Sequence, residues 1–133
     1  MFEYLMPLLV MPNFENTLLD QTYQSVVQRQ IDYGIERGVP WGVSESGYYA
    51  FDSSLNYQYR AFGIPGLGLK RGLGDDLVIA PYASMLALMV APAEACANLQ
   101  RMVKAGFEGM FGLHLEGKFG LHEAIDYTPI RIP

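Results

Sequence analysis

The 133-residue sequence is poor in the residues that mark several common classes of protein. Cys96 is its one cysteine, so no disulfide can form within the chain. The apolar helical pattern around Cys96 predicts a buried, inert thiol. Nine lysines and arginines stand against 14 acidic residues, and Lys70-Arg71 is the only basic pair. This lack of basic clusters argues against a nucleic-acid partner, because such proteins carry concentrated positive charge.

Long hydrophobic runs are also missing. Residues 1–11 are apolar, but they carry Glu3 and Pro7 and lack the basic start and small-residue cleavage site of a signal peptide. The apolar run 79–93 is too short to cross a bilayer. We therefore expect a soluble protein with a single domain over residues 1–133. Its apolar start, without a polar lead-in, suggests a piece of a longer protein.

Apolar periodicity predicts three helices. The first covers about residues 17–37, with Asn16 or Thr17 as its cap and Gly38 at its end. Its expected buried stripe is Leu19, Tyr23, Val26, Val27, Gln30, Ile31 and Ile35. Two further helices, at about 80–90 and 93–105, are separated by so short a break that they should form an antiparallel hairpin.

The rest of the sequence predicts little regular structure. Residues 41–79 are rich in Gly, Tyr and Ser, and within them 57–62 could form a short strand or one helical turn. Loops of such length in a compact domain usually carry the function. Near the C-terminus, residues 108–114 recur almost unchanged at 116–122, which indicates a local duplication or a short β-hairpin.

Residues 40–49, PWGVSESGYY, combine one carboxylate with two hydroxyls and three large aromatic side chains. Aromatic rings can cover the apolar face of a sugar, and a carboxylate can act on its hydroxyls or on a glycosidic oxygen. The alternative is a loop whose aromatic residues fill the core. Taken alone, the segment favours this alternative.

Other motifs give weaker signals. The glycine loop 66–72 lacks the spacing and the strand–helix context of a nucleotide site. His114 and His122 lie eight residues apart, which is not the spacing of a typical metal site, so we expect neither a metal nor another cofactor. Carboxylates among aromatics and glycines are the remaining candidates for acid–base chemistry. They are Glu3, Glu45, Asp52, Asp75, Asp76, Glu123 and Asp126.

Five blocks of the sequence resemble a known family. They are residues 1–7 (MFEYLMP), 40–46 (PWGVSES), 61–72 (AFGIPGLGLKRG), 78–83 (VIAPYA) and 123–129 (EAIDYTP). In this order they closely resemble the glucoamylase-like domain of bacterial cyclic β-1,2-glucan synthases. The resemblance covers nearly the whole chain, which makes it far more specific than any single motif.

The resemblance implies an all-α fold, a partial (α/α)6 toroid whose funnel binds a β-glucan oligosaccharide or polysaccharide. It implies transglycosylation that closes a glucan ring, or hydrolysis. By matched motif, the catalytic candidates are Glu45, then Glu123 and Asp126. Those for sugar binding are Glu3, Trp41, Tyr49 and Arg60. The resemblance also implies a cytoplasmic location for this chain, although the parent synthases are inner-membrane proteins.

The sequence departs from the family pattern in two ways. A complete toroid needs about twelve helices, whereas this chain supplies about five, so we expect a homo-oligomer or a separate remainder of the barrel. The duplicated eight residues precede Glu123 and could displace it, and an error of about 1 Å in such a site can cost about a hundredfold in rate. The alternative is therefore an inactive half-barrel that serves as an oligomeric or sugar-binding module.

Overall fold

The computed structural model describes residues 1–51, 53–68, 72–107 and 124–128. The described part is mostly helical, as predicted. In chain order its elements are α1 (Phe2–Leu5), the 3₁₀-helix η1 (Met6–Leu9), α2 (Leu18–Arg37), β1 (Ser46–Phe51), β2 (Tyr57–Arg60), β3 (Val78–Ile79), α3 (Pro81–Ala87), α4 (Pro92–Lys104) and β4 (Ile125–Asp126). The strands form two small antiparallel sheets, which an all-α fold would lack.

Helix α2 begins and ends as the sequence predicts. The Thr17 side chain accepts a hydrogen bond from the Asp20 backbone N–H at 3.2 Å, and Gly38 ends the helix with a φ of 69°. The predicted stripe is wrong at both of its ends, because Leu19 and Ile35 are exposed. The residues of α2 that are buried are Tyr23, Val26, Val27, Gln30, Tyr33 and Gly34.

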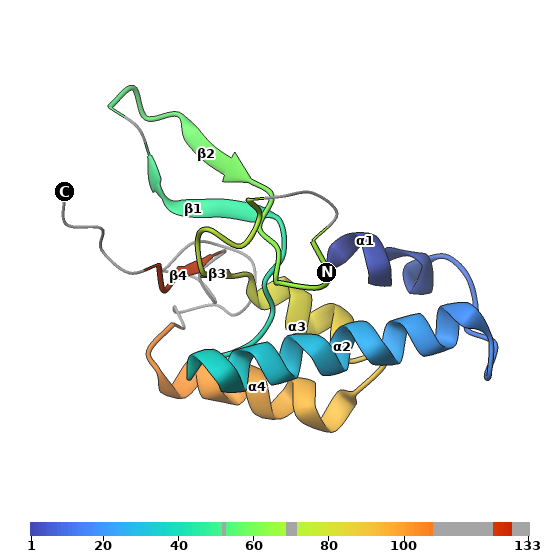
Figure 1. Ribbon diagram of the computed structural model, residues 1–133. Helices are drawn as coiled ribbons and strands as arrows, with labels where there is room; N and C mark the ends of the chain where they lie inside the picture. The colour runs from blue at the N-terminus through green and yellow to red at the C-terminus, as the bar shows by residue number, and fades with distance from the viewer. Residues whose placement is uncertain (52, 69–71, 108–123, 129–133) are drawn as a thin grey trace.

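Helices α3 and α4 pack against each other, as expected for a helical hairpin (Figure 1). Proline occupies the first turn of each, where its missing N–H costs no hydrogen bond. Helix α4 buries Ala95, Asn98 and Met102. The predicted buried thiol is wrong: Cys96 is exposed, because the spacing of the buried residues puts it on the other side of the helix.

The region 41–79 is more regular than predicted. Strands β1 and β2 pair as an antiparallel hairpin that projects away from the helices (Figure 1), with Ser46 opposite Arg60 and Gly47 opposite Tyr59. Strands β3 and β4 pair through Val78 with Asp126 and Ile79 with Ile125. The strand alternative for residues 57–60 is thus confirmed. The duplicated segments, 108–114 and 116–122, lie outside the described residues.

The core has two parts, and the segment before β1 contributes to both. Trp41 joins the cluster formed by α1, α2, α3 and α4, where Val26 and Ala83 are also buried. Val43 joins the cluster around β3 and β4. Residues 39–44 are all buried, so the chain passes through the core before it reaches Glu45.

Candidate functional site

Buried side-chain amides fix the backbone that leads to Glu45. Gln30 of α2 donates to the Val43 carbonyl at 2.8 Å and accepts from the Val43 N–H at 2.9 Å. Asn98 of α4 does the same at Trp41, accepting from its N–H at 3.1 Å and donating to its carbonyl at 2.8 Å. Both amides are almost fully buried. Each amide supplies the backbone hydrogen bonds that a neighbouring strand would otherwise give, because a buried backbone group without a partner is costly.

Two glycines let the same segment approach its neighbours closely. A Cβ at Gly34 would lie 2.7 Å from the Trp41 Cβ, so only glycine allows Trp41 to pack on α2. Gly42 has a φ of 123°, a conformation that favours glycine. Its carbonyl accepts from the Ala80 N–H at 3.0 Å, which ties the segment to the start of α3.

A chain of hydrogen bonds ends at Glu45 itself. The Phe2 N–H donates to the Ser44 hydroxyl at 3.1 Å, and the Ser44 and Tyr82 hydroxyls lie 2.8 Å apart. The Tyr82 hydroxyl donates to the Glu45 carbonyl at 2.7 Å. This chain links α1, α3 and the entry to β1, so it fixes the backbone from which the Glu45 side chain projects.

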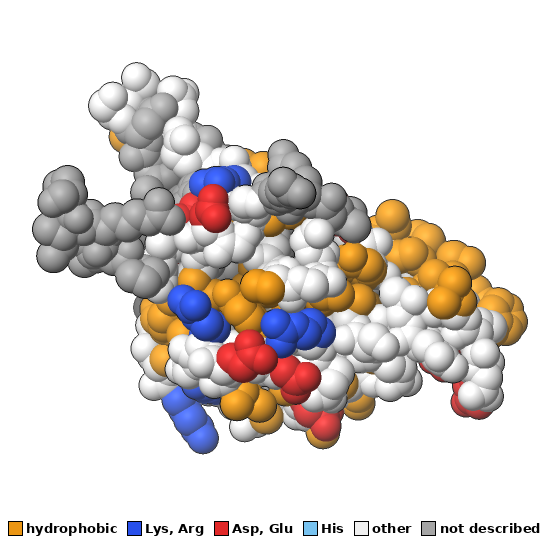
Figure 2. All heavy atoms as spheres, in the orientation of Figure 1, with side chains coloured by type: hydrophobic (Ala, Val, Ile, Leu, Met, Phe, Trp, Pro, Cys, Tyr) orange, Lys and Arg blue, Asp and Glu red, His pale blue; other side chains and the backbone are white. Residues whose placement is uncertain are grey.

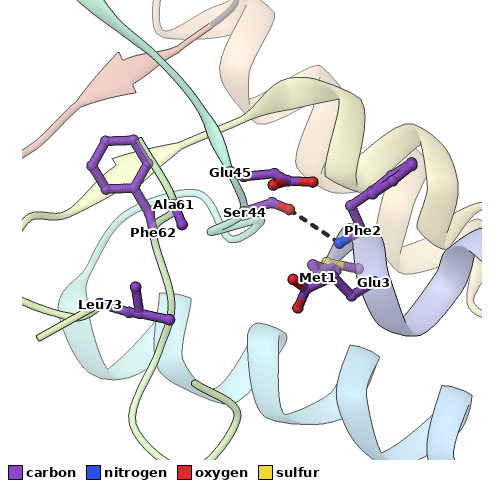
Figure 3. Close-up of a pocket in the computed structure, with 8 residues that line it drawn as sticks. All are labelled: Met1, Phe2, Glu3, Ser44, Glu45, Ala61, Phe62 and Leu73. Carbon is purple, nitrogen blue, oxygen red and sulfur yellow. Dashed lines mark hydrogen bonds between the residues drawn. The ribbon is translucent and has the colours of Figure 1, made fainter. Parts of the chain in front are cut away.

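The Glu45 side chain lines a cavity of about 390 Å³ (Figure 3). The described lining residues are Met1, Phe2, Glu3, Ser44, Glu45, Ala61, Phe62 and Leu73. Glu3 and Glu45 reach this cavity from different elements, α1 and the segment before β1 (Figure 3). The volume lies in the range of small-molecule sites, which commonly combine apolar walls with a few polar groups.

The two carboxylates make the site negative. Burial is the largest effect that raises the pKa of the Tyr82 hydroxyl, and the charges of Glu45 and Glu3 add to it, whereas the Ser44 hydrogen bond opposes them. The Met1 amino group also lies at the cavity, and burial lowers its pKa. Among the described lining residues no lysine or arginine balances the acids. Such a lining suits a neutral, hydroxyl-rich ligand or a cationic transition state.

The structure brings Glu3 and Glu45 of the predicted set together at the cavity, whereas Trp41, Arg60 and Asp126 are not among its described lining residues. Trp41 lies in the core, in agreement with the alternative interpretation of its segment, and is not among the described cavity-lining residues. Arg60 forms an ion pair with Asp76 at 2.8 Å. Asp126 is exposed on β4, where its carboxylate accepts from the Thr128 N–H at 2.8 Å. The backbone of Tyr49 lies in β1.

Glu123, the second catalytic candidate, lies outside the described residues. Its catalytic role stays a prediction, and so do the roles of Asp126, Trp41, Tyr49 and Arg60.

Sequence reasoning assigned no supporting role to the residues around the carboxylate, although it placed Gln30 correctly in the buried stripe of α2. Gln30 and Asn98 each stand at a position where the helical pattern calls for an apolar side chain, and that was the available signal. Ser44 and Tyr82 lie in two of the family-like blocks but carried no role in the prediction. The pairing of Tyr82 with Glu45 joins residues 37 apart, and no local pattern reveals it.

Two further expectations concern metals and membranes. Within the described ranges, no group of three or more His, Cys, Asp or Glu residues is arranged to hold a metal ion. None of the helices in those ranges combines the length and the apolar character that crossing a bilayer requires.

Comparison with known proteins identifies the family of the chain. The model of Glycoamylase, a glucoamylase family, matches residues 1–130. The chain belongs to this glucoamylase-like family. Over all its 133 residues the chain is 51% identical to the cyclic beta-(1,2)-glucan synthase NdvB of Rhizobium meliloti (strain 1021). It spans only 4% of the length of that protein. The resemblance inferred from the five sequence blocks is thus confirmed.

Proposed function

We propose that this glucoamylase-like chain processes β-1,2-linked glucan, with Glu45 as the catalytic acid. The observation that carries the proposal is the placement of Glu45: its backbone carbonyl accepts a hydrogen bond from the half-buried Tyr82, while its side chain lines a cavity that Glu3 shares. Membership of the family supports a carbohydrate substrate. The linkage is taken from the name of the glucan synthase that the chain resembles.

The chemistry requires a second carboxylate. In a retaining transfer, which could close a glucan ring, the two carboxyl groups lie about 5–5.5 Å apart, and in an inverting hydrolysis about 6.5–9.5 Å apart. Glu123 is the proposed partner of Glu45, with Asp126 as the next candidate. Glu3 shares the cavity with Glu45 and is proposed to contact the sugar. The anomeric form of the first product, followed by NMR, distinguishes the two outcomes.

Incubation with linear β-1,2-glucan, followed by mass spectrometry of the products, tests the proposed function. We expect shorter, longer or cyclic glucans from the wild type and a loss of about 10²–10⁴-fold in rate for Glu45→Gln. Glu15→Gln is the matched control, because Glu15 is an exposed carboxylate that lines none of the described cavities. Equal inertness of the wild type and Glu45→Gln would remove the enzymatic role.

One feature favours the second candidate function, an assembled module. Apolar side chains gather over η1 and the segment that leads to α2 (Figure 2). They include Met6, Leu9, Val10, Met11, Phe14 and Leu18, and Val10 and Leu18 are 78% and 84% exposed. Continuous exposed apolar surface commonly marks an interface. We propose that a second copy of the chain covers this surface, and a monomer in light scattering at working concentration would contradict this.

The partial toroid also belongs to the proposal. In this arrangement the described helices form one sector of the ring, and the cavity at Glu45 opens toward its axis. The missing sectors come from further copies or from the rest of a longer barrel.

A further inference from the structure

Glu45 also lines a second hollow, of about 210 Å³. Its described lining consists of Phe2, Glu45, Ser46, Tyr59 and Tyr82. Phe2 and Glu45 belong to the linings of both hollows, so the two adjoin at these side chains. The second hollow is several times larger than the roughly 30 Å³ that one water molecule occupies in the liquid.

Three of the five residues in this lining are aromatic. Phe2 and Tyr82 pack edge to face, with ring centroids 6.3 Å apart and an angle of 71° between the rings. Tyr82 is fixed by its bonds to Ser44 and Glu45, so this wall is set before any ligand arrives. Aromatic walls with a few polar groups are typical of sites for ligands that, like sugars, have both apolar faces and polar edges.

Tyr59 forms the opposite, open side. It lies on β2, is 58% exposed, and stands across from Gly47, which has no side chain, in the hairpin. Tyr59 and Glu45 line the same hollow. Desolvation raises the pKa of Tyr59 to about 12, and hydrogen bonding to Glu45 and the Glu45 charge act in the same direction. The hydroxyl therefore keeps its proton, and can donate it in a hydrogen bond, at every physiological pH.

We propose that the hollow formed by Phe2, Ser46, Tyr59 and Tyr82 is a second sugar subsite, and that Tyr59 positions the Glu45 carboxylate between it and the 390 Å³ cavity. The inference rests on the proposed function, because the ligand is the same β-1,2-glucan. A chain that occupied both hollows would pass over Glu45, with one glycosidic oxygen beside the carboxylate. Tyr59 is thus a positioning residue that also contacts the sugar.

Calorimetric titration with a linear β-1,2-glucan oligosaccharide of several glucose units tests the subsite. We expect Tyr59→Ala to raise the Kd about tenfold, because it removes the open aromatic wall. Tyr59→Phe keeps the ring and should change the Kd less than about threefold. Ser53→Ala, an exposed change in the turn of the same hairpin, is the control and should leave the Kd unchanged.

The positioning role has a separate readout, the pH profile of kcat/KM. Tyr59→Phe removes a donor that favours the ionised form of Glu45. Because a catalytic acid acts in its protonated form, the alkaline limb of the profile should move to higher pH while the Kd stays close to that of the wild type. A merely structural role of Tyr59 would leave this limb in place. Because Tyr59→Phe keeps the exposed ring, this test stands even if Tyr59→Ala fails to fold.

The outcomes separate the two proposals. If the wild type processes or binds the glucan but Tyr59→Ala binds it equally well, the second subsite is wrong and the proposed function stands. An unmoved alkaline limb in Tyr59→Phe would overturn the positioning role alone. If the wild type neither binds nor processes the glucan, the proposed function fails and the inference fails with it.

Discussion

The segment that precedes Glu45 and the β1–β2 hairpin that follows it meet at the same carboxylate, but different interactions hold them. The segment is buried, and Gln30 and Asn98 hold its backbone from two helices. The hairpin projects from the molecule, and its inner end carries the ion pair between Arg60 and Asp76. The two regions differ in how they are held: buried amides fix the backbone before Glu45, and in the proposed function the exposed hairpin leaves room for a long glucan.

The largest loss of stability is expected from substitution of a buried amide. Asn98→Ala should lower the free energy of unfolding by about 2–4 kcal/mol, because it leaves the Trp41 N–H, and in part the Trp41 carbonyl, without a partner in the core. Urea denaturation followed by circular dichroism measures the change. Gln100→Ala, an exposed amide change on the same helix, should stay within about 0.5 kcal/mol. Equal effects of the two variants would contradict the role of the buried amides.

Gly34→Ala is expected to come next. Alanine in a helix usually stabilises by up to about 1 kcal/mol relative to glycine. Here the new Cβ would meet Trp41 at 2.7 Å, so we expect a loss of about 1–3 kcal/mol in the free energy of unfolding. Thermal or urea unfolding gives the sign, with the exposed Ser25→Ala on α2 as the control. A stabilised Gly34→Ala protein would show that Trp41 does not pack on α2 as described.

A smaller effect is predicted on the hairpin side. Arg60→Gln removes the ion pair with Asp76, in which the Arg60 side chain is 46% exposed. Solvent screens such a pair, so the free energy of unfolding should fall by less than about 1 kcal/mol. Urea denaturation at low and high salt measures this, and the small difference should shrink as salt is added. A loss as large as that of Asn98→Ala would remove the contrast between the two regions.

The smallest effect is a titration. Tyr59, with its pKa raised to about 12, should ionise about two pH units above an ordinary tyrosine. In Glu45→Gln the negative charge is gone, so the pKa of Tyr59 should fall toward 10, which ultraviolet absorption of tyrosinate follows. Because the folded pKa is raised, the contribution to stability is present below pH 10 and is lost as the pH rises toward 12. An unchanged pKa of Tyr59 in Glu45→Gln would show that the Glu45 charge does not act on the Tyr59 hydroxyl.

Much of the helical framework could be predicted from the sequence because its signals are local. The Thr17 cap, the Gly38 end and the proline starts of α3 and α4 lie within a turn of the boundaries they set. The β1–β2 hairpin was not predicted, since glycine and serine dilute its strand pattern. The exposure of Leu19 and Ile35 depends on what packs against the ends of α2, which periodicity alone does not state.

The sequence indicated Glu45 as a site residue but not the contacts that support it. Glu45 stood out because a carboxylate among aromatics suggests sugar chemistry, and the family blocks supported it. Trp41, equally prominent in the sequence, lies in the core, because large aromatics serve packing and binding alike. The supporting contacts from Gln30, Asn98 and Tyr82 join distant parts of the chain and emerge only from the fold.

An experimental structure of Glu45→Gln with a linear β-1,2-glucan oligosaccharide bound tests most directly whether the glucan passes over Glu45. The substitution keeps the shape of the side chain and slows cleavage, so an intact ligand can be observed. We expect a glycosidic oxygen within about 2.6–3.2 Å of the residue 45 side chain. Sugar rings should lie in the cavity beside Glu3 and in the hollow beside Tyr59. A glucan bound elsewhere, with both hollows around residue 45 free of sugar, would contradict it.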